Sequence, residues 1–180
     1  TERAHVEEVF PGEGVGHENA TGHNIGRSLF DETGQKVKFP PIPSFAAGVF
    51  ATARPIDTAK SKQFRKGLAK LNEEGVVQVL KDPDWGDASP VLAAVGQLQF
   101  DVFANRLEFE FNAPIEISPA PYQAIRVTDK ESAEILRQKP GVRILARFSG
   151  DIVALFENKY ALQRIEQNEP ELRLDHIVAT

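Results

Sequence analysis

Residues 60–111 constrain the fold most, because two helix-periodic segments alternate there with short runs of valine and leucine. Phe64, Leu68 and Leu71 recur at i, i+4 and i+7, which predicts one buried stripe on an amphipathic helix. Gly75 follows as a helix stop, and the runs at 76–80 and 91–95 are β-prone. The order strand, helix, strand, strand, helix predicts helices packed on a sheet, which is an α+β fold.

A second helix is predicted to begin after Gly96. We expect one apolar face, formed by Phe100, Phe103, Leu107 and Phe111 and widened by Leu98, Val102 and Phe109.

The elements around these helices complete two similar units. A strand is predicted at 45–54, and Asp57 or Thr58 is expected to cap the first helix, which ends near Glu74. The loop 82–90 has turn chemistry, and its Trp85 is expected to pack on the domain edge, with a docking role as the alternative. Beyond it we predict strands at 114–117, 122–128, 143–148, 152–156 and 171–177, and helices at 129–138 and 157–166. The pattern predicts split β-α-β (ferredoxin-like) units side by side.

Residues 1–40 differ in character, with short β-prone pieces separated by Gly, Pro and Asn and no helical period. We interpret them as the last strands of a β-barrel domain and residues 41–180 as the C-terminal α+β domain. Pro40, Pro41 and Pro43 exclude helix interior or central strand, so this segment is predicted to be the linker. Recognition of the proline segment by another protein is the alternative.

The composition is that of a soluble globular protein, with 41% hydrophobic and 26% charged residues. The absence of cysteine excludes disulfides and thiolate metal sites, and we expect a cytoplasmic protein without a membrane span. The absence of methionine leads us to expect a fragment of a longer product. The net charge is −5, so any contact with RNA must come from a local basic patch.

Two segments carry a family resemblance. SKQFRKGLAKLNEEGVVQV, followed by AVGQLQFDVFANRL, resembles the third domain of the bacterial peptide chain release factor 3 family of translational GTPases. The looser pattern at 96–102 also resembles elongation factor G, which is an alternative family. Against that alternative stand the EEG block and the short tail of about 65 residues after Asn112. At the end of the barrel Ile25-Gly26 matches the release factor pattern, whereas Arg27 replaces an acidic residue.

The resemblance implies a non-catalytic part of a ribosome-dependent GTPase that promotes departure of class I release factors from the ribosome. Its implied partners are the small-subunit side of the ribosomal factor site, the protein's own GTPase domain and, indirectly, the class I release factors. No phosphate-binding loop occurs in the sequence, so GTP and Mg²⁺ are expected to bind upstream, and no cofactor is expected here. A small ferredoxin-like enzyme or metabolite-binding module remains a third reading, because this fold hosts many functions.

The predicted ribosome-contacting residues are basic. Lys62, Lys66 and Lys70 are spaced i, i+4 and i+8, opposite the apolar stripe of the first helix, with Lys60 and Arg65 beside them. Such a face is most often simply solvated, but clustered cations also bind phosphates. A second, less regular basic set is Arg126, Lys130, Arg137, Lys139, Arg143 and Arg147.

The remaining candidates are structural or interdomain residues, namely Pro40, Pro41, Pro43, Glu73, Glu74 and Gly96. Glu73 and Glu74 place like charges at the unfavourable end of the helix dipole, so we expect a structural or interface role for them. No metal site is predicted, since His17, Glu18 and His23 lack the spacing of ligands on one helical face. No catalytic constellation is found.

Overall fold

The computed structural model describes residues 47–82 and 86–177 and, near the N-terminus, residues 8, 10, 12 and 14. Side chains are described for all of these except 86–88. The predictions for the barrel strands, the proline segment, Trp85, His17 and His23 lie outside the described residues.

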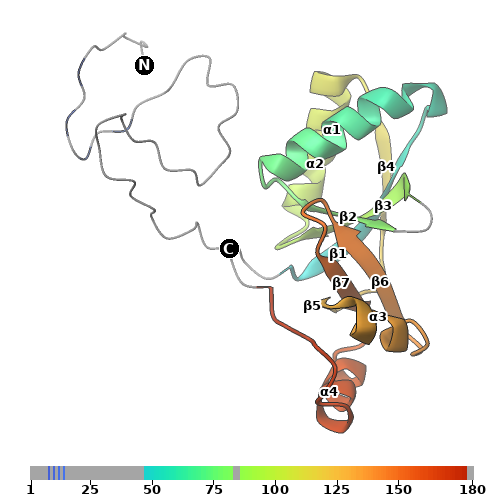
Figure 1. Ribbon diagram of the computed structural model, residues 1–180. Helices are drawn as coiled ribbons and strands as arrows, with labels where there is room; N and C mark the ends of the chain where they lie inside the picture. The colour runs from blue at the N-terminus through green and yellow to red at the C-terminus, as the bar shows by residue number, and fades with distance from the viewer. Residues whose placement is uncertain are drawn as a thin grey trace.

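The described chain alternates strands and helices, as predicted (Figure 1). The first half consists of β1 (Val49–Pro55), a 3₁₀ turn η1 (Thr58–Lys60), α1 (Ser61–Glu73), β2 (Gln78–Asp82), β3 (Gly86–Ala94), α2 (Leu98–Phe111) and β4 (Ile115–Pro119). The second half consists of β5 (Ala124–Thr128), α3 (Lys130–Leu136), β6 (Val142–Arg147), β7 (Ile152–Phe156) and α4 (Lys159–Asn168). The α+β prediction is confirmed.

All seven strands form one antiparallel sheet with the order β4-β1-β3-β2-β6-β7-β5. Because β1 and β2 both pair antiparallel to β3, they are parallel to each other with β3 between them. In the second half β7 lies between β5 and β6 in the same way. Each half therefore contains a strand-helix-strand crossover split by a third strand.

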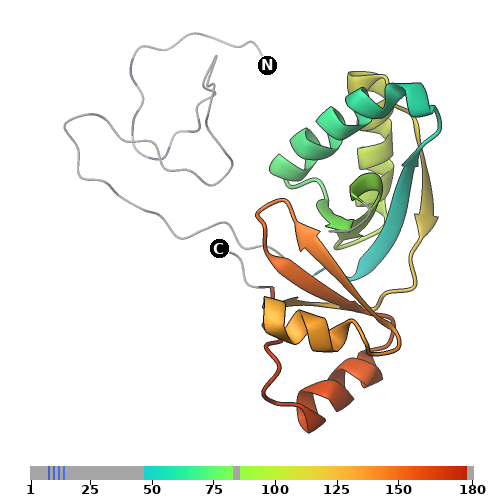
Figure 2. The same cartoon turned by 45° about the vertical axis from the view of Figure 1, so that its right-hand side comes forward.

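Strand alternation divides the core into three layers. One face of the first half-sheet packs on α1 and α2, through a cluster that contains Phe64, Leu92 and Phe103. The corresponding face of the second half-sheet packs on α3 and α4, around Leu136 and Phe156. The opposite faces of the two halves share one cluster: Phe50, Leu80, Val91, Ala93, Ile125, Leu145, Val153 and Leu155. The helix pairs accordingly lie at opposite ends of the molecule, with the strands between them (Figure 2).

The expectation for α2 is wrong at three positions. Phe100, Phe103 and Leu107 are buried, whereas Leu98, Val102 and Phe109 are exposed. At about 100° per residue, the exposed set lies roughly 180° around the helix from the buried set. A helix that packs against one sheet and one neighbouring helix buries a single stripe, so the second apolar stripe remains outside.

Two strand boundaries also differ from the prediction. β3 begins at Gly86, inside the predicted turn, and its pairing with β2 shifts between Leu80 and Asp82. This irregularity accommodates Pro90, which cannot donate a ladder hydrogen bond. The predicted C-terminal strand is reduced to one bridge between Asp175 and Val127, and Leu172 of the same segment is buried.

The predicted cap lies one turn earlier than expected. Asp57 accepts a hydrogen bond from the Ala59 backbone N–H and caps η1, which leads into α1, whereas the N-cap position of α1 itself is Lys60 and has no side-chain cap bond. Gly75, at φ +73°, follows the end of α1 in the left-handed conformation that favours glycine.

The cap of α3 yields a prediction about pH. The Asp129 carboxylate accepts a hydrogen bond of 2.8 Å from the Ser132 backbone N–H, and this bond lowers the pKa of Asp129. A folded-state pKa below the unfolded value means that the cap stabilises the fold above about pH 4 and loses its effect as pH falls through the folded pKa. Asp129→Ala should lower the urea midpoint at neutral pH, and the difference from wild type should shrink on acidification. Glu134→Ala, at an exposed site beyond the first turn of the same helix, is the control. A difference independent of pH would contradict the prediction.

Candidate functional site

The outer face of α1 carries three exposed cations, which we call the α1 basic face: Lys62, Arg65 and Lys66. It points away from the buried stripe of Phe64, Leu68 and Leu71, as the spacing predicted. Within the described part of the chain, none of the three forms a side-chain hydrogen bond or ion pair. They lie in the first turns of α1, where the helix dipole disfavours positive charge. Neither an ion pair nor the helix dipole therefore accounts for their placement.

Two other predicted members of this stripe are engaged within the chain. The Lys60 Nζ lies 2.9 Å from the Asn112 Oδ1, which ties the start of α1 to the end of α2. The Lys70 Nζ lies 3.4 Å from Glu73 Oε2 and 3.9 Å from Glu74 Oε1. The free positive charge is thus confined to the N-terminal half of α1.

The acidic pair at the end of α1 takes part in an inter-helix ion pair. Arg106 of α2 donates hydrogen bonds to Glu110, one turn away, and to Glu74 of α1. Both carboxylates raise the pKa of Arg106, the bond to Glu110 having the larger effect. Glu74 therefore has a clear structural contact, and Glu73 contacts only Lys70 in the described part of the chain.

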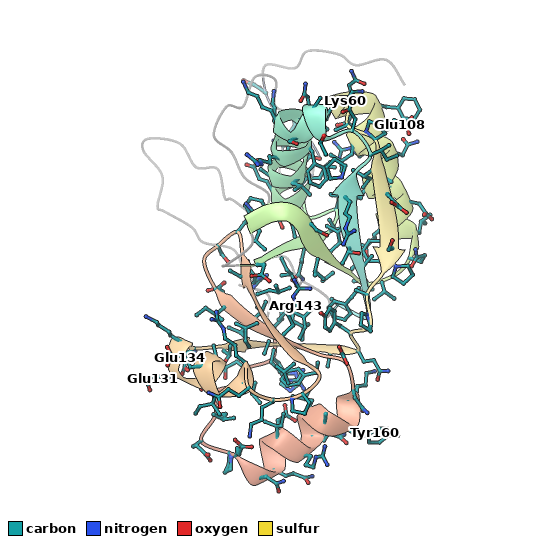
Figure 3. All side chains as sticks on the ribbon, turned by 90° about the vertical axis from the view of Figure 1, so that its right-hand side faces the viewer. Lys60, Glu108, Glu131, Glu134, Arg143 and Tyr160 are labelled. Carbon is teal, nitrogen blue, oxygen red and sulfur yellow. The ribbon has the colours of Figure 1, made fainter. Side chains whose placement is uncertain are left out.

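Arg143 and Arg147 lie apart from the α1 basic face. Arg143 sits between the two halves of the molecule, whereas Lys60 lies at the far end of the first half (Figure 3). The Arg143 Nη2 is 3.0 Å from the Asp82 Oδ2, so it joins β6 to β2. Burial opposes its charge, but hydrogen bonds to Tyr122 and Asp82 outweigh that effect and raise the pKa of Arg143. Arg147 lies 3.7 Å from Asp151 across the β6–β7 turn.

The rest of the second basic set is also largely paired within the chain. Arg126 contacts Glu166 at 3.1 Å, and Lys139 contacts Glu169 at 2.5 Å. Lys130 has no ion pair in the described part of the chain. Sequence spacing could not show that Arg126, Lys139 and Arg143 are paired, because their partners lie 30 to 61 residues away.

Gly67 is a structural residue that the sequence reasoning missed. A Cβ there would lie 2.3 Å from the Leu107 Cδ2, so the glycine allows α1 and α2 to approach closely. Its signal was a glycine in the middle of a predicted helix. At Gly96, by contrast, a Cβ would meet nothing within 4 Å. The residue that organises this turn is Gln99, whose side chain accepts a hydrogen bond from the Val95 N–H at 2.7 Å.

In the described part of the chain no group of three His, Cys, Asp or Glu side chains could hold a metal ion. None of the helices in that part of the chain combines the length and the apolar character of a membrane span.

Residues 39–166 match the family model described as class II release factor RF3, C-terminal domain. The chain belongs to this family. Peptide chain release factor 3 of Nostoc punctiforme is 35% identical over 178 residues, which are 98% of this chain and 32% of the relative. The protein of the same name from Gloeobacter violaceus is 37% identical over 179 residues, which are 98% of this chain and 33% of the relative.

The release factor 3 resemblance is therefore confirmed in preference to elongation factor G. The chain spans about a third of the length of these relatives. The α1 basic face and the Glu74–Arg106 pair both lie within the matched range.

Proposed function

We propose that this chain is the ribosome-binding C-terminal region of a translation termination factor and that the α1 basic face contacts ribosomal RNA. Membership of the RF3 C-terminal family and the names of its relatives support a role in termination. The observation that carries the contact is the set of three exposed cations without a partner in the described chain.

The charge distribution supports a local rather than a general interaction with RNA. The chain has a net charge of −5, so its overall field repels nucleic acid. The α1 basic face is an exception on that acidic body, and its side chains extend from a rigid helix whose other side is buried. Such a face binds phosphates through charge, with little dependence on base sequence.

For the whole protein we propose a GTPase that promotes departure of class I release factors after peptide release. GTP and Mg²⁺ would bind in an upstream domain, and residues 1–40 would complete a β-barrel between that domain and the domain of residues 41–180. The segment with Pro40, Pro41 and Pro43 would transmit nucleotide state to this domain. Shortening it in the intact factor should impair recycling while sparing GTP binding; recycling at the normal rate would argue against this role.

Co-sedimentation with bacterial ribosomes over a salt series tests the RNA contact. Replacing Lys62, Arg65 and Lys66 with glutamate should weaken binding at least about tenfold at low salt. The slope of the logarithm of the binding constant against the logarithm of salt concentration should become shallower, by the amount expected for the loss of roughly two to three phosphate contacts.

The matched control carries the same charge change at the other end of the molecule, with Lys130, Lys159 and Arg164 replaced by glutamate. These three are exposed on α3 and α4 and unpaired in the described chain. An equal loss of affinity in both variants would show that the effect comes from net charge and not from the α1 basic face. If the α1 variant binds as tightly as the wild type, the α1 basic face does not contact the ribosome. If the wild-type chain does not bind at all, the proposed role of the isolated chain in ribosome binding is wrong.

A further inference from the structure

α2 carries an exposed apolar surface that neither the core nor the α1 basic face explains. It consists of Leu98, Val102 and Phe109, which are 73%, 43% and 74% exposed, and we call it the α2 stripe. At about 100° per residue, the three lie within roughly 40° of one another around the helix. Val95, directly before α2, is also exposed. Grouped apolar surface of this kind is typical of a site that binds another molecule.

The spacing of the α2 stripe is that of a seam between two helices. With Asn105, which is also exposed, the stripe follows steps of four, three and four residues, at Leu98, Val102, Asn105 and Phe109. Alternating steps of four and three residues define the a and d positions of a heptad, along which one helix packs on another. The occupant that fits this spacing is therefore an α-helix laid along α2, and not an extended peptide.

Unpaired carboxylates border one side of the α2 stripe. Asp101 and Glu108 directly precede Val102 and Phe109, which puts both carboxylates at the heptad position that faces charged residues of a partner helix. Within the described residues, neither carboxylate has an ion pair or a side-chain hydrogen bond. Cations at the facing positions of a partner would complete ion pairs along this border.

The other border of the α2 stripe is acidic in sum. Arg106 and Glu110 lie there, and Arg106 donates hydrogen bonds to Glu110 and to Glu74 of α1. One cation is thus shared by two carboxylates, so this border carries a net negative charge. A partner helix with cations on both sides of its apolar residues would complement α2 in polarity and in charge.

A second copy of the chain complements α2 less well. Antiparallel pairing of two α2 helices would place Asp101 and Glu108 of one copy against the same carboxylates of the other, and like charges at these positions repel. Parallel pairing would direct Asp101 toward an Arg106 that Glu74 and Glu110 already engage. The net charge of −5 adds to the repulsion between copies. The charges therefore favour a basic partner over self-association.

We propose that the α2 stripe docks an amphipathic α-helix of a partner protein, which carries lysine or arginine on both sides of its apolar residues. The partner helix lies along α2, and its cations face Asp101 and Glu108. Because α2 has 14 residues, the contact covers about two heptads, so the interface is small and the binding reversible. This docking does not depend on the RNA contact proposed for the α1 basic face.

The affinity of the chain for designed helical peptides tests this proposal. One peptide of about three heptads has leucine at its a and d positions and lysine at its e and g positions, and its counterpart has glutamate in place of lysine. Like charges at e and g keep each peptide from pairing with itself. Fluorescence anisotropy of each labelled peptide, titrated with the whole chain, measures the two affinities. We expect the lysine peptide to bind at least about tenfold more tightly. Equal affinities, or binding of neither peptide, would overturn the proposal.

Reversal of charge separates the α2 stripe from the net charge of the chain. Asp101→Lys combined with Glu108→Lys should invert the preference, so that the glutamate peptide binds more tightly. Glu131→Lys combined with Glu134→Lys makes the same change in net charge at exposed sites on α3, in the other half of the molecule (Figure 3). This control should retain the preference for the lysine peptide. An equal loss of preference in both variants would contradict docking on α2.

A second pair of variants tests the apolar part of the contact. Leu98→Ser combined with Phe109→Ser should weaken binding of the lysine peptide at least about tenfold. Ile135→Ser combined with Tyr160→Ser removes two exposed side chains of the other half and should leave the affinity nearly unchanged. Circular dichroism on each variant shows that it is folded before affinities are compared. Lysine-peptide binding that is unaffected by the Leu98 and Phe109 changes would remove the stripe from the contact.

The oligomeric state of the chain alone supplies the remaining outcome. Sedimentation equilibrium should give a monomer. A dimer that the combined Leu98→Ser and Phe109→Ser variant abolishes would show that a second copy covers the α2 stripe, and the proposed partner would then be wrong.

Discussion

Phe103→Ala should lower the free energy of unfolding by about 3–5 kcal/mol, which is a large share of the stability of a domain of this size. Phe103 has no exposed surface and lies in the core between α1, α2 and the first half-sheet. The truncation removes the transfer free energy of the ring and leaves a cavity that two helices and a sheet cannot close by local movement. Urea unfolding, followed by circular dichroism, measures the change.

Tyr160→Ala is the matched control for this prediction. Tyr160 is an aromatic residue on α4 with 79% of its surface exposed, so its removal should change stability by less than about 0.5 kcal/mol. A Phe103 variant as stable as the Tyr160 variant would contradict the assigned packing of α2.

Gly67→Ala should destabilise the protein by about 1–3 kcal/mol, although helix propensity alone predicts the opposite sign. Alanine in place of glycine inside an exposed helix usually stabilises by up to about 1 kcal/mol. Here the added Cβ would lie 2.3 Å from the Leu107 Cδ2, and Leu107 is fully buried. It would also lie 3.1 Å from the Phe111 ring. The helices must separate or Leu107 must leave its rotamer, and the core resists both.

A double mutant distinguishes the steric cause from any other. Leu107→Val shortens the side chain that the new Cβ meets, so the loss caused by Gly67→Ala should be smaller in that background. Gly96→Ala, where the Cβ would meet nothing within 4 Å, should be close to neutral. A stabilised Gly67→Ala variant would show that α1 and α2 are not in close contact at this position.

The periodicity of apolar residues was sufficient to predict the helices and strands and most of the buried residues in the first half of the fold. Phe64, Leu68 and Leu71 are buried as their spacing predicted, because a helix that packs on a sheet needs one apolar stripe. The strand predicted at 152–156 has those bounds in the structure, and Gly75 ends α1 in the predicted way. These features depend on residues that are close together in the sequence, so a local sequence pattern is enough to predict them.

The candidate site was only partly predictable for the same reason. The spacing of Lys62 and Lys66 placed them on the outer face of α1, but it also included Lys70, which the nearby Glu73 and Glu74 engage. Nothing in the local sequence distinguishes Arg143 from these exposed lysines, yet Arg143 is paired with Asp82, which lies 61 residues away on a neighbouring strand. The free or paired state of a cation depends on which strands and helices meet.

By itself the sequence determined the α+β class, the order of strands and helices, the RF3 family and the basic outer face of α1, since each rests on local periodicity or contiguous motifs. Tertiary structure decided that α2 buries one of its two apolar stripes and leaves Leu98, Val102 and Phe109 outside. It also decided that Gly67, rather than Gly96, is the glycine required by packing. The physical reason is that burial and close approach are properties of the surface against which an element packs, and distant parts of the chain supply that surface.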